Sequence, residues 1–205
     1  MTMNRRRPIR PLALAAGLAL AVAFAALPAG AASQKATFDP KRSQVRFVLD
    51  SPLHTVHGTF ALRSGEVSFD PATGTASGTI VVDATSGESG NRSRDAKMHQ
   101  EVLESARFPQ IVFSAQRLEG AVPEQGTGSV KLHGTLSLHG APHPVVLPAT
   151  LKRQGDHLWA TVRISIPFIA WGLKDPSLLL VKVDRKVEIT IEAEATLSTA
   201  GDLAR

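Results

Sequence analysis

At 205 residues, the chain is long enough for one domain with a sizeable core, and the absence of cysteine excludes disulfide bonds and a lipid-modified cysteine anchor. Four arginines before residue 11 account for most of the formal charge of +5; without residues 1–31 the chain carries 19 basic and 18 acidic residues, or +1. No cluster of lysine and arginine remains there, so the charge gives no argument for binding to nucleic acid.

The first 31 residues have the three parts of a secretory signal peptide. A basic stretch, NRRRPIR, precedes the apolar run PLALAAGLALAVAFAAL, and the small residues PAGAAS follow. A transmembrane anchor is the alternative, but the apolar run lies near the lower limit of about 17 residues for a span and no positive stop follows it. We therefore expect cleavage after Ala31, a domain at 32–205, a periplasmic or secreted location and no stable membrane span after processing.

From Phe38 onward, apolar and polar residues alternate, which is typical of antiparallel strands with one buried face. About eight or nine strand segments follow one another, separated by short turn signals such as Asp70-Pro71 and Gln154-Gly155. The clearest example is KVEITIEAEATL, in which the apolar residues from Val187 to Ala193 share one face and the glutamates the other. The pattern predicts an all-β sandwich or barrel.

Four phenylalanines, Phe47, Phe60, Phe69 and Phe113, have the parity of the buried face. In a sandwich their rings would interdigitate and fill the interior. In a barrel of about eight strands the interior can hold one small ligand. Parity alone does not separate these two outcomes.

One segment, residues 94–105, interrupts the strand pattern with charged residues at helical spacing. Met98, Val102 and Leu103 form an apolar stripe, and Asp95 is placed to cap one or two turns of amphipathic helix. A helix this short is marginal in water unless it lies on an apolar surface. We therefore expect it to lie on an apolar surface, and in a barrel that surface is the core exposed at an open end, where the segment would act as a lid.

The polar residues give weaker indications of chemistry. Seven histidines are scattered along the chain; without cysteine or an H-E-x-x-H motif, they predict surface or turn positions and no metal site. GESGN, residues 87–91, lacks the last glycine of a nucleophile elbow. The pair Arg94-Asp95 either meets a ligand head group or fixes the lid by an ion pair or cap, and the structural role is favoured.

Four separated segments resemble the YceI-like family of polyisoprenoid-binding periplasmic proteins. They read HTVHGTF (54–60), RDAKMHQEVLESARFPQIVF (94–113), GTLSLHGAPHPVVLPATL (134–151) and IAWGLKDPSLLLVKVDRKVEITIEAE (169–194). The resemblance covers residues 36–195 and implies an antiparallel lipocalin-like β-barrel of about eight strands with a lipid-filled interior. Two pairs depart from the family pattern: Lys97-Met98 stands where His-Leu is common, and Val102-Leu103 where Phe-Phe is common.

The resemblance and the apolar pattern together predict an exported binding protein that sequesters a long apolar lipid of the polyisoprenoid or isoprenoid-quinone type. No enzymatic activity, cofactor or metal is expected, and a homodimer is one option for the oligomeric state. Two alternatives stay open: an envelope enzyme with His, Arg and Asp residues at the barrel mouth, and a filled β-domain that acts through protein contacts. The expected ligand-binding residues are Phe47, Phe60, Phe69, Met98, Val102, Leu103, Phe113, Leu136 and Ile164.

Overall fold

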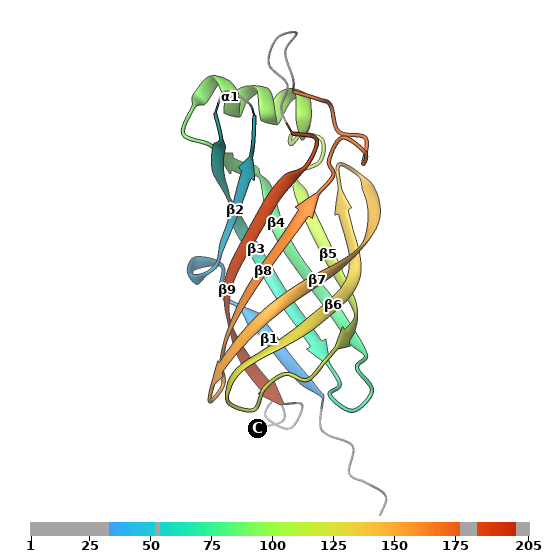
Figure 1. Cartoon of the computed structure of the whole chain (residues 1–205). Coiled ribbons are helices and arrows are strands. Elements are labelled where there is room, and N and C mark those ends of the chain that lie inside the picture. The colour runs from blue at the N-terminus through green and yellow to red at the C-terminus, as the bar shows by residue number, and fades with distance from the viewer. Residues whose placement is uncertain (1–32, 52–53, 177–183, 200–205) are drawn as a thin grey trace, which may run out of the picture.

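The computed structural model describes residues 33–51, 54–176 and 184–199, and the expected signal peptide lies outside them (Figure 1). The described chain is almost entirely antiparallel β-structure. Its strands are β1 (Gln34–Phe38), β2 (Gln44–Leu49), β3 (Val56–Phe69), β4 (Ala76–Glu88), β5 (Gln110–Glu119), β6 (Gly126–Leu138), β7 (Ala141–Gln154), β8 (His157–Ile166) and β9 (Val187–Thr199). The helical segments are the 3-10 turn η1 (Pro40–Arg42), α1 (Arg92–Lys97) and the π-helical turn η2 (Met98–Val102). No helix in these ranges is long and apolar enough to span a membrane.

The nine strands close into a barrel with eight positions, because β1 and β2 share one position between β3 and β9. In β1, Gln34 lies opposite Phe69 of β3 and also opposite Thr199 of β9. Where β1 ends, β2 takes its place and pairs with the next residues of β3 and β9. Pairing of β3 with β4 then closes the sheet. The predicted antiparallel barrel of about eight strands is confirmed.

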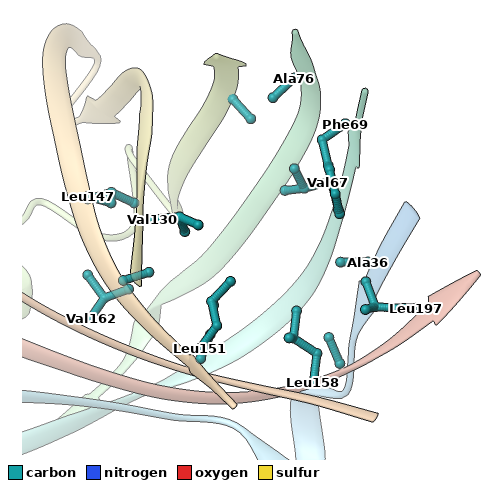
Figure 2. Close-up of a cluster of buried hydrophobic side chains, with 14 of the residues drawn as sticks. Ala36, Val67, Phe69, Ala76, Val130, Leu147, Leu151, Leu158, Val162 and Leu197 are labelled. Carbon is teal, nitrogen blue, oxygen red and sulfur yellow. The ribbon is translucent and has the colours of Figure 1, made fainter. Parts of the chain in front are cut away.

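The inner wall is apolar because period-two alternation sends every second side chain into the barrel. One buried cluster lies at the end near β1 and the last residues of β9, with Val67, Phe69, Leu151 and Leu197 among its members (Figure 2). A smaller cluster at the other end contains Leu138, Ile166, Phe168 and Leu173.

One part of the wall is interrupted, between β7 and β8. The strand β7 pairs with β6 along its whole length but with β8 only from Ala149 to Gln154. The stretch of β7 that does not pair with β8 contains Pro142, Pro144 and Pro148, which have no N–H to donate. The segment after β8 packs against this stretch, where the indole of Trp171 stacks on the imidazole of His143 with ring centroids 4.0 Å apart.

The expected lid lies across one end of the barrel, where β2 and β3 meet (Figure 1). It consists of α1, η2 and the residues up to Phe108, so that the helical interruption predicted from the sequence is present. The last turn is π-helical, and the N–H of Leu103 donates to the carbonyl of Met98 at 2.8 Å.

Candidate functional site

The barrel encloses a cavity of about 700 Å³. Residues from all nine strands line it, and the strand residues that face it are apolar. This volume lies within the range of about 300–1,000 Å³ that is typical of small-molecule sites. The interior is therefore a space for an apolar ligand.

All nine residues expected to bind a ligand line this one cavity. Six of them lie on strands: Phe47, Phe60, Phe69, Phe113, Leu136 and Ile164. The other three, Met98, Val102 and Leu103, reach the cavity from the lid. The rings of Phe47 and Phe60 lie 5.3 Å apart on neighbouring strands, tilted by 43°.

Two glycines make room for the rings near the lid. Gly58 lies opposite Phe47 in the ladder, and a Cβ there would lie 2.2 Å from the Phe47 ring. At Gly87, near the end of β4, a Cβ would lie 2.5 Å from the ring of Phe60 and 2.9 Å from Cε of Met98. Lid and wall therefore meet in close contact above Gly87.

The polar residues of the cavity lining gather at the lid end, which we call the mouth. They come from the connection between β2 and β3, from the connection between β4 and α1, and from α1 itself. They are Ser51, His54, Ser89, Asn91, Ser93, Arg94 and Lys97. The far end of the cavity is apolar and includes Phe69, Leu118 and Val122. The site is a dry tube with one polar end.

Helix α1 is capped by Asn91, so the cap expected at Asp95 was wrong. The side-chain oxygen of Asn91 accepts hydrogen bonds from the N–H groups of Ser93 and Arg94, both at 3.1 Å. Asn91 lies in the extended conformation that an N-cap needs, whereas Asp95 already lies within the helix.

Asp95 and Arg94 both bind Ser89 at the end of β4. A carboxylate oxygen of Asp95 accepts from the Ser89 N–H at 2.9 Å and from its hydroxyl. Arg94 donates from Nε to the Ser89 hydroxyl at 2.7 Å and from Nη2 to its carbonyl at 2.8 Å. The pair therefore fixes the start of the lid on the wall, as the favoured structural role implied.

His99 ties the middle of the lid to β4, although the sequence had suggested a surface or turn position. Its Nε2 donates to the carbonyl of Gly87 at 2.8 Å, and its Nδ1 lies 2.9 Å from the hydroxyl of Ser105, which is itself buried. A carbonyl can only accept, so Nε2 carries a hydrogen and a neutral ring accepts from Ser105 at Nδ1.

Further contacts join the lid to segments beyond β4. Lys174 donates to Glu101 at 2.5 Å, and this hydrogen bond lowers the pKa of the Glu101 carboxyl group below its usual value. Glu104 accepts from His139 at 3.1 Å, in the turn between β6 and β7. The lid is therefore attached to β4, to the segment after β8 and to the turn between β6 and β7.

The sequence did not predict that the polar residues of the mouth lie together. Of these residues, the sequence connects only Arg94 with a head group, and Lys97 stands out only as a departure from the family pattern. His54 lines the mouth with an exposed side chain, whereas His57 is exposed and does not line the cavity, as the odd spacing between them allows. Within the described residues, no three His, Asp or Glu side chains gather in a way that would hold a metal ion.

The arrangement resembles solved structures over most of its length. BcnA of Burkholderia cenocepacia superposes with a TM-score of 0.64 at 21% identity, covering 78% of this chain and 99% of that one. A domain from Saccharophagus degradans, described as polyisoprenoid-binding and implicated in plant cell wall breakdown, gives a TM-score of 0.60 at 14% identity, covering 80% and 98%. These likenesses show the same fold.

Sequence relatives cover much of the chain as well. A UPF0312 protein of Pseudomonas syringae pathovar tomato is 31% identical over 186 residues, or 85% of this chain and 94% of the relative. A UPF0312 protein of Vibrio campbellii is 27% identical over 154 residues, or 73% and 78%. The family model of the YceI-like domain matches residues 37–195, and the chain therefore belongs to the YceI-like family.

Proposed function

We propose that the protein binds one long apolar lipid and keeps its tail inside the barrel, without chemical conversion. The observation that carries this proposal is the cavity of about 700 Å³, whose strand lining is apolar and whose polar residues lie at one end only. A molecule with an extended apolar tail and a small polar head matches that distribution.

The driving force is burial of the tail. Each CH₂ group moved from water into an apolar site contributes about 0.8 kcal/mol. A tail of several isoprene units therefore offers a large gross gain, from which the ordering of the tail and of the lid subtracts. No reactive group is needed, only a dry interior and a lid that opens.

An isoprenoid tail is the ligand class we infer. Support comes from the family of the chain and from the Saccharophagus degradans domain of the same fold, which is described as polyisoprenoid-binding. Either a polyisoprenoid or an isoprenoid quinone would place its tail among Phe47, Phe60 and Phe113 in the barrel.

Neither alternative is as well supported. A filled β-domain would leave no room for a ligand, whereas the cavity here is as large as many small-molecule sites. An enzyme at the mouth would need an acid and a base placed to act together, but Arg94 and Asp95 are both engaged with Ser89, and no described residue that lines the cavity is a carboxylate. Binding therefore remains the function that the geometry supports best.

Binding can be tested on the purified protein. Native mass spectrometry should show a mass above that of the polypeptide, and extraction with organic solvent should return a single class of long-chain lipid. Protein that has been unfolded, washed and refolded without lipid serves as the control and should show the polypeptide mass. Parent protein that carries no lipid, and refolded protein that takes up none, would overturn the proposal.

We also propose that the protein acts outside the cytoplasm, after export and cleavage following Ala31. The basic, apolar and small-residue parts of the first 31 residues support this. N-terminal sequencing of protein from the cell envelope should find Ala32 as the first residue. A folded cytoplasmic pool that retains Met1 would contradict export.

A further inference from the structure

The side chains at the mouth differ from the rest of the cavity lining in charge as well as polarity. Arg94 and Lys97 carry positive charge there, and none of the described residues that line the cavity is a carboxylate. His54, Ser51, Ser93 and Asn91 add groups that donate hydrogen bonds. A ligand head placed at the mouth therefore meets mainly donors and cations.

The two cations are compensated to different degrees. Arg94 shares Ser89 with the carboxylate of Asp95, so its charge is largely balanced, although its Nη1 has no partner among the described residues. Lys97 has no hydrogen-bond or ion-pair partner in the described chain. One turn further along, Glu101 is hydrogen-bonded to Lys174, and the charge of Lys97 lowers the pKa of Glu101 less than Lys174 does.

Lys97 is also placed where a head group would be. It is the last residue of α1, half-buried, and directly precedes Met98, whose side chain meets the Phe60 ring region above Gly87. A tail that passes between Phe60 and Met98 would bring its head next to the Lys97 ammonium group. A cation held at the end of a dry tube attracts an anion more strongly than it would in open water.

We propose that the mouth selects amphiphiles whose head is an anionic group that only accepts hydrogen bonds, a carboxylate or a phosphate. Lys97 is the residue that determines this selection, which rests on the proposed lipid binding. Arg94 and the hydroxyl of Ser93 complete the set of donors. A neutral head on the same tail binds more weakly, because it leaves the Lys97 charge uncompensated as the ligand displaces water.

The test uses three ligands that share one apolar chain: oleic acid, oleyl phosphate and oleyl alcohol. Their affinities are measured by displacement of a fluorescent fatty acid from refolded, lipid-free protein. The acid and the phosphate should bind the parent about tenfold more tightly than the alcohol, as expected for one charge-assisted hydrogen bond. Added salt should weaken the two anions and leave the alcohol unchanged.

Variants separate the role of Lys97 from that of the fold. Lys97→Met should weaken the acid and the phosphate about tenfold without weakening the alcohol, because the charge that a neutral head leaves uncompensated is then gone, and Lys97→Arg should restore both anions. Lys152→Met removes an exposed lysine on the outer face of β7 and should alter none of the three affinities. Unfolding midpoints of all variants check that each one folds.

Three other outcomes would each contradict a specific part of the proposal. Equal affinity of the parent for acid and alcohol, or equal weakening of all three ligands by Lys97→Met, would overturn the selection while leaving lipid binding intact. Displacement of the acid by inorganic phosphate at similar concentration would show a site for the free anion and would overturn the assignment to a head group. Failure of all three ligands to bind would overturn the selection by the mouth, and it would overturn the proposed function as well if the parent protein also carries no lipid.

Discussion

The ammonium group of Lys174 lies 2.5 Å from a carboxylate oxygen of Glu101, and this contact joins the segment after β8 to the π-helical turn over the mouth. The contact ties the lid to the segment that follows β8 and acts as a clasp on the lid. Glu101→Gln should speed the release of bound lipid by about two- to fivefold, since exposed ion pairs contribute little. Stopped-flow measurement of lipid release checks this. An unchanged rate would show that the clasp does not hold the lid.

The same pair predicts how release depends on pH. The hydrogen bond from Lys174 lowers the pKa of Glu101 below its ordinary value of 4.5. A carboxyl group with a lowered pKa in the folded protein stabilises it above the ordinary value, and this contribution is lost as the pH falls through the lowered pKa. Release should therefore be constant from pH 7 to about 5 and accelerate below about 4.5. Glu101→Gln should remove the acceleration. Glu119→Gln is the control, because the pKa of Glu119 is also lowered, by Lys131 and His133, at the other end of β5.

His99 should matter more for stability than the other histidines. His99→Phe would leave the carbonyl of Gly87 and the buried hydroxyl of Ser105 without their partner, at a cost of about 1–3 kcal/mol for a buried group. His57→Phe, on the outside of β3, should change the free energy of unfolding by less than about 0.5 kcal/mol. Urea unfolding of both variants makes the comparison. Similar stability of the two would mean that water replaces His99 without loss.

Features of the fold and the site that depend on residues close together in the sequence could be predicted from it. The alternation of apolar and polar residues is such a feature, because successive side chains of a strand point in turn to the dry inner face and the outer face of the barrel. The inward positions of Phe47 and Phe113 could therefore be predicted. The lid could be predicted for the same reason, from the spacing of Met98, Val102 and Leu103.

The features that depend on long-range pairing could not be predicted. The same parity suits a filled sandwich and a hollow barrel, so the volume of the cavity follows only from closure. His54 and Lys97 lie more than forty positions apart in the sequence, and only the barrel brings the connection between β2 and β3 and helix α1 to one mouth. The cap at Asn91 was missed because both Asn91 and Asp95 are suitable cap residues, and the contact of Asp95 with Ser89 decides between them.

Chelation of metal should leave the protein unchanged. In the described chain no three potential ligand side chains lie together, and His99 and His139 are both engaged with lid residues. EDTA should shift neither the melting temperature nor the retention of lipid. A structural metal site would respond with a loss of several degrees, because metal binding at such a site is part of the folding free energy. Differential scanning calorimetry with and without EDTA distinguishes the two.

Gly87→Ala should open the mouth without unfolding the barrel. The added Cβ would lie 2.9 Å from Cε of Met98 and 2.5 Å from the Phe60 ring, and the flexible methionine yields more easily than the wall. We expect faster lipid release and a loss of stability of about 1–3 kcal/mol from crowding. In the background of Met98→Ala, the same change should have a smaller effect on release, because part of the clash is gone. Independent, additive effects of the two substitutions would contradict contact between them.

Phe60→Trp tests whether the interior is a tube or a solid core. The Phe60 ring lies on the cavity lining, 5.3 Å from the ring of Phe47, so a larger ring can extend into the empty volume. We expect weaker retention of lipid and little change in stability, because overpacking strains a structure only where no space exists. In a filled core the same substitution would cost about 1–3 kcal/mol of unfolding free energy. Val146→Trp, on the exposed outer face of β7, adds bulk outside the barrel and should leave lipid retention unchanged. Unfolding midpoints and lipid release rates for both variants separate the cases: a sharp loss of stability in Phe60→Trp, together with no lipid on the parent protein, would mean that no ligand occupies the barrel.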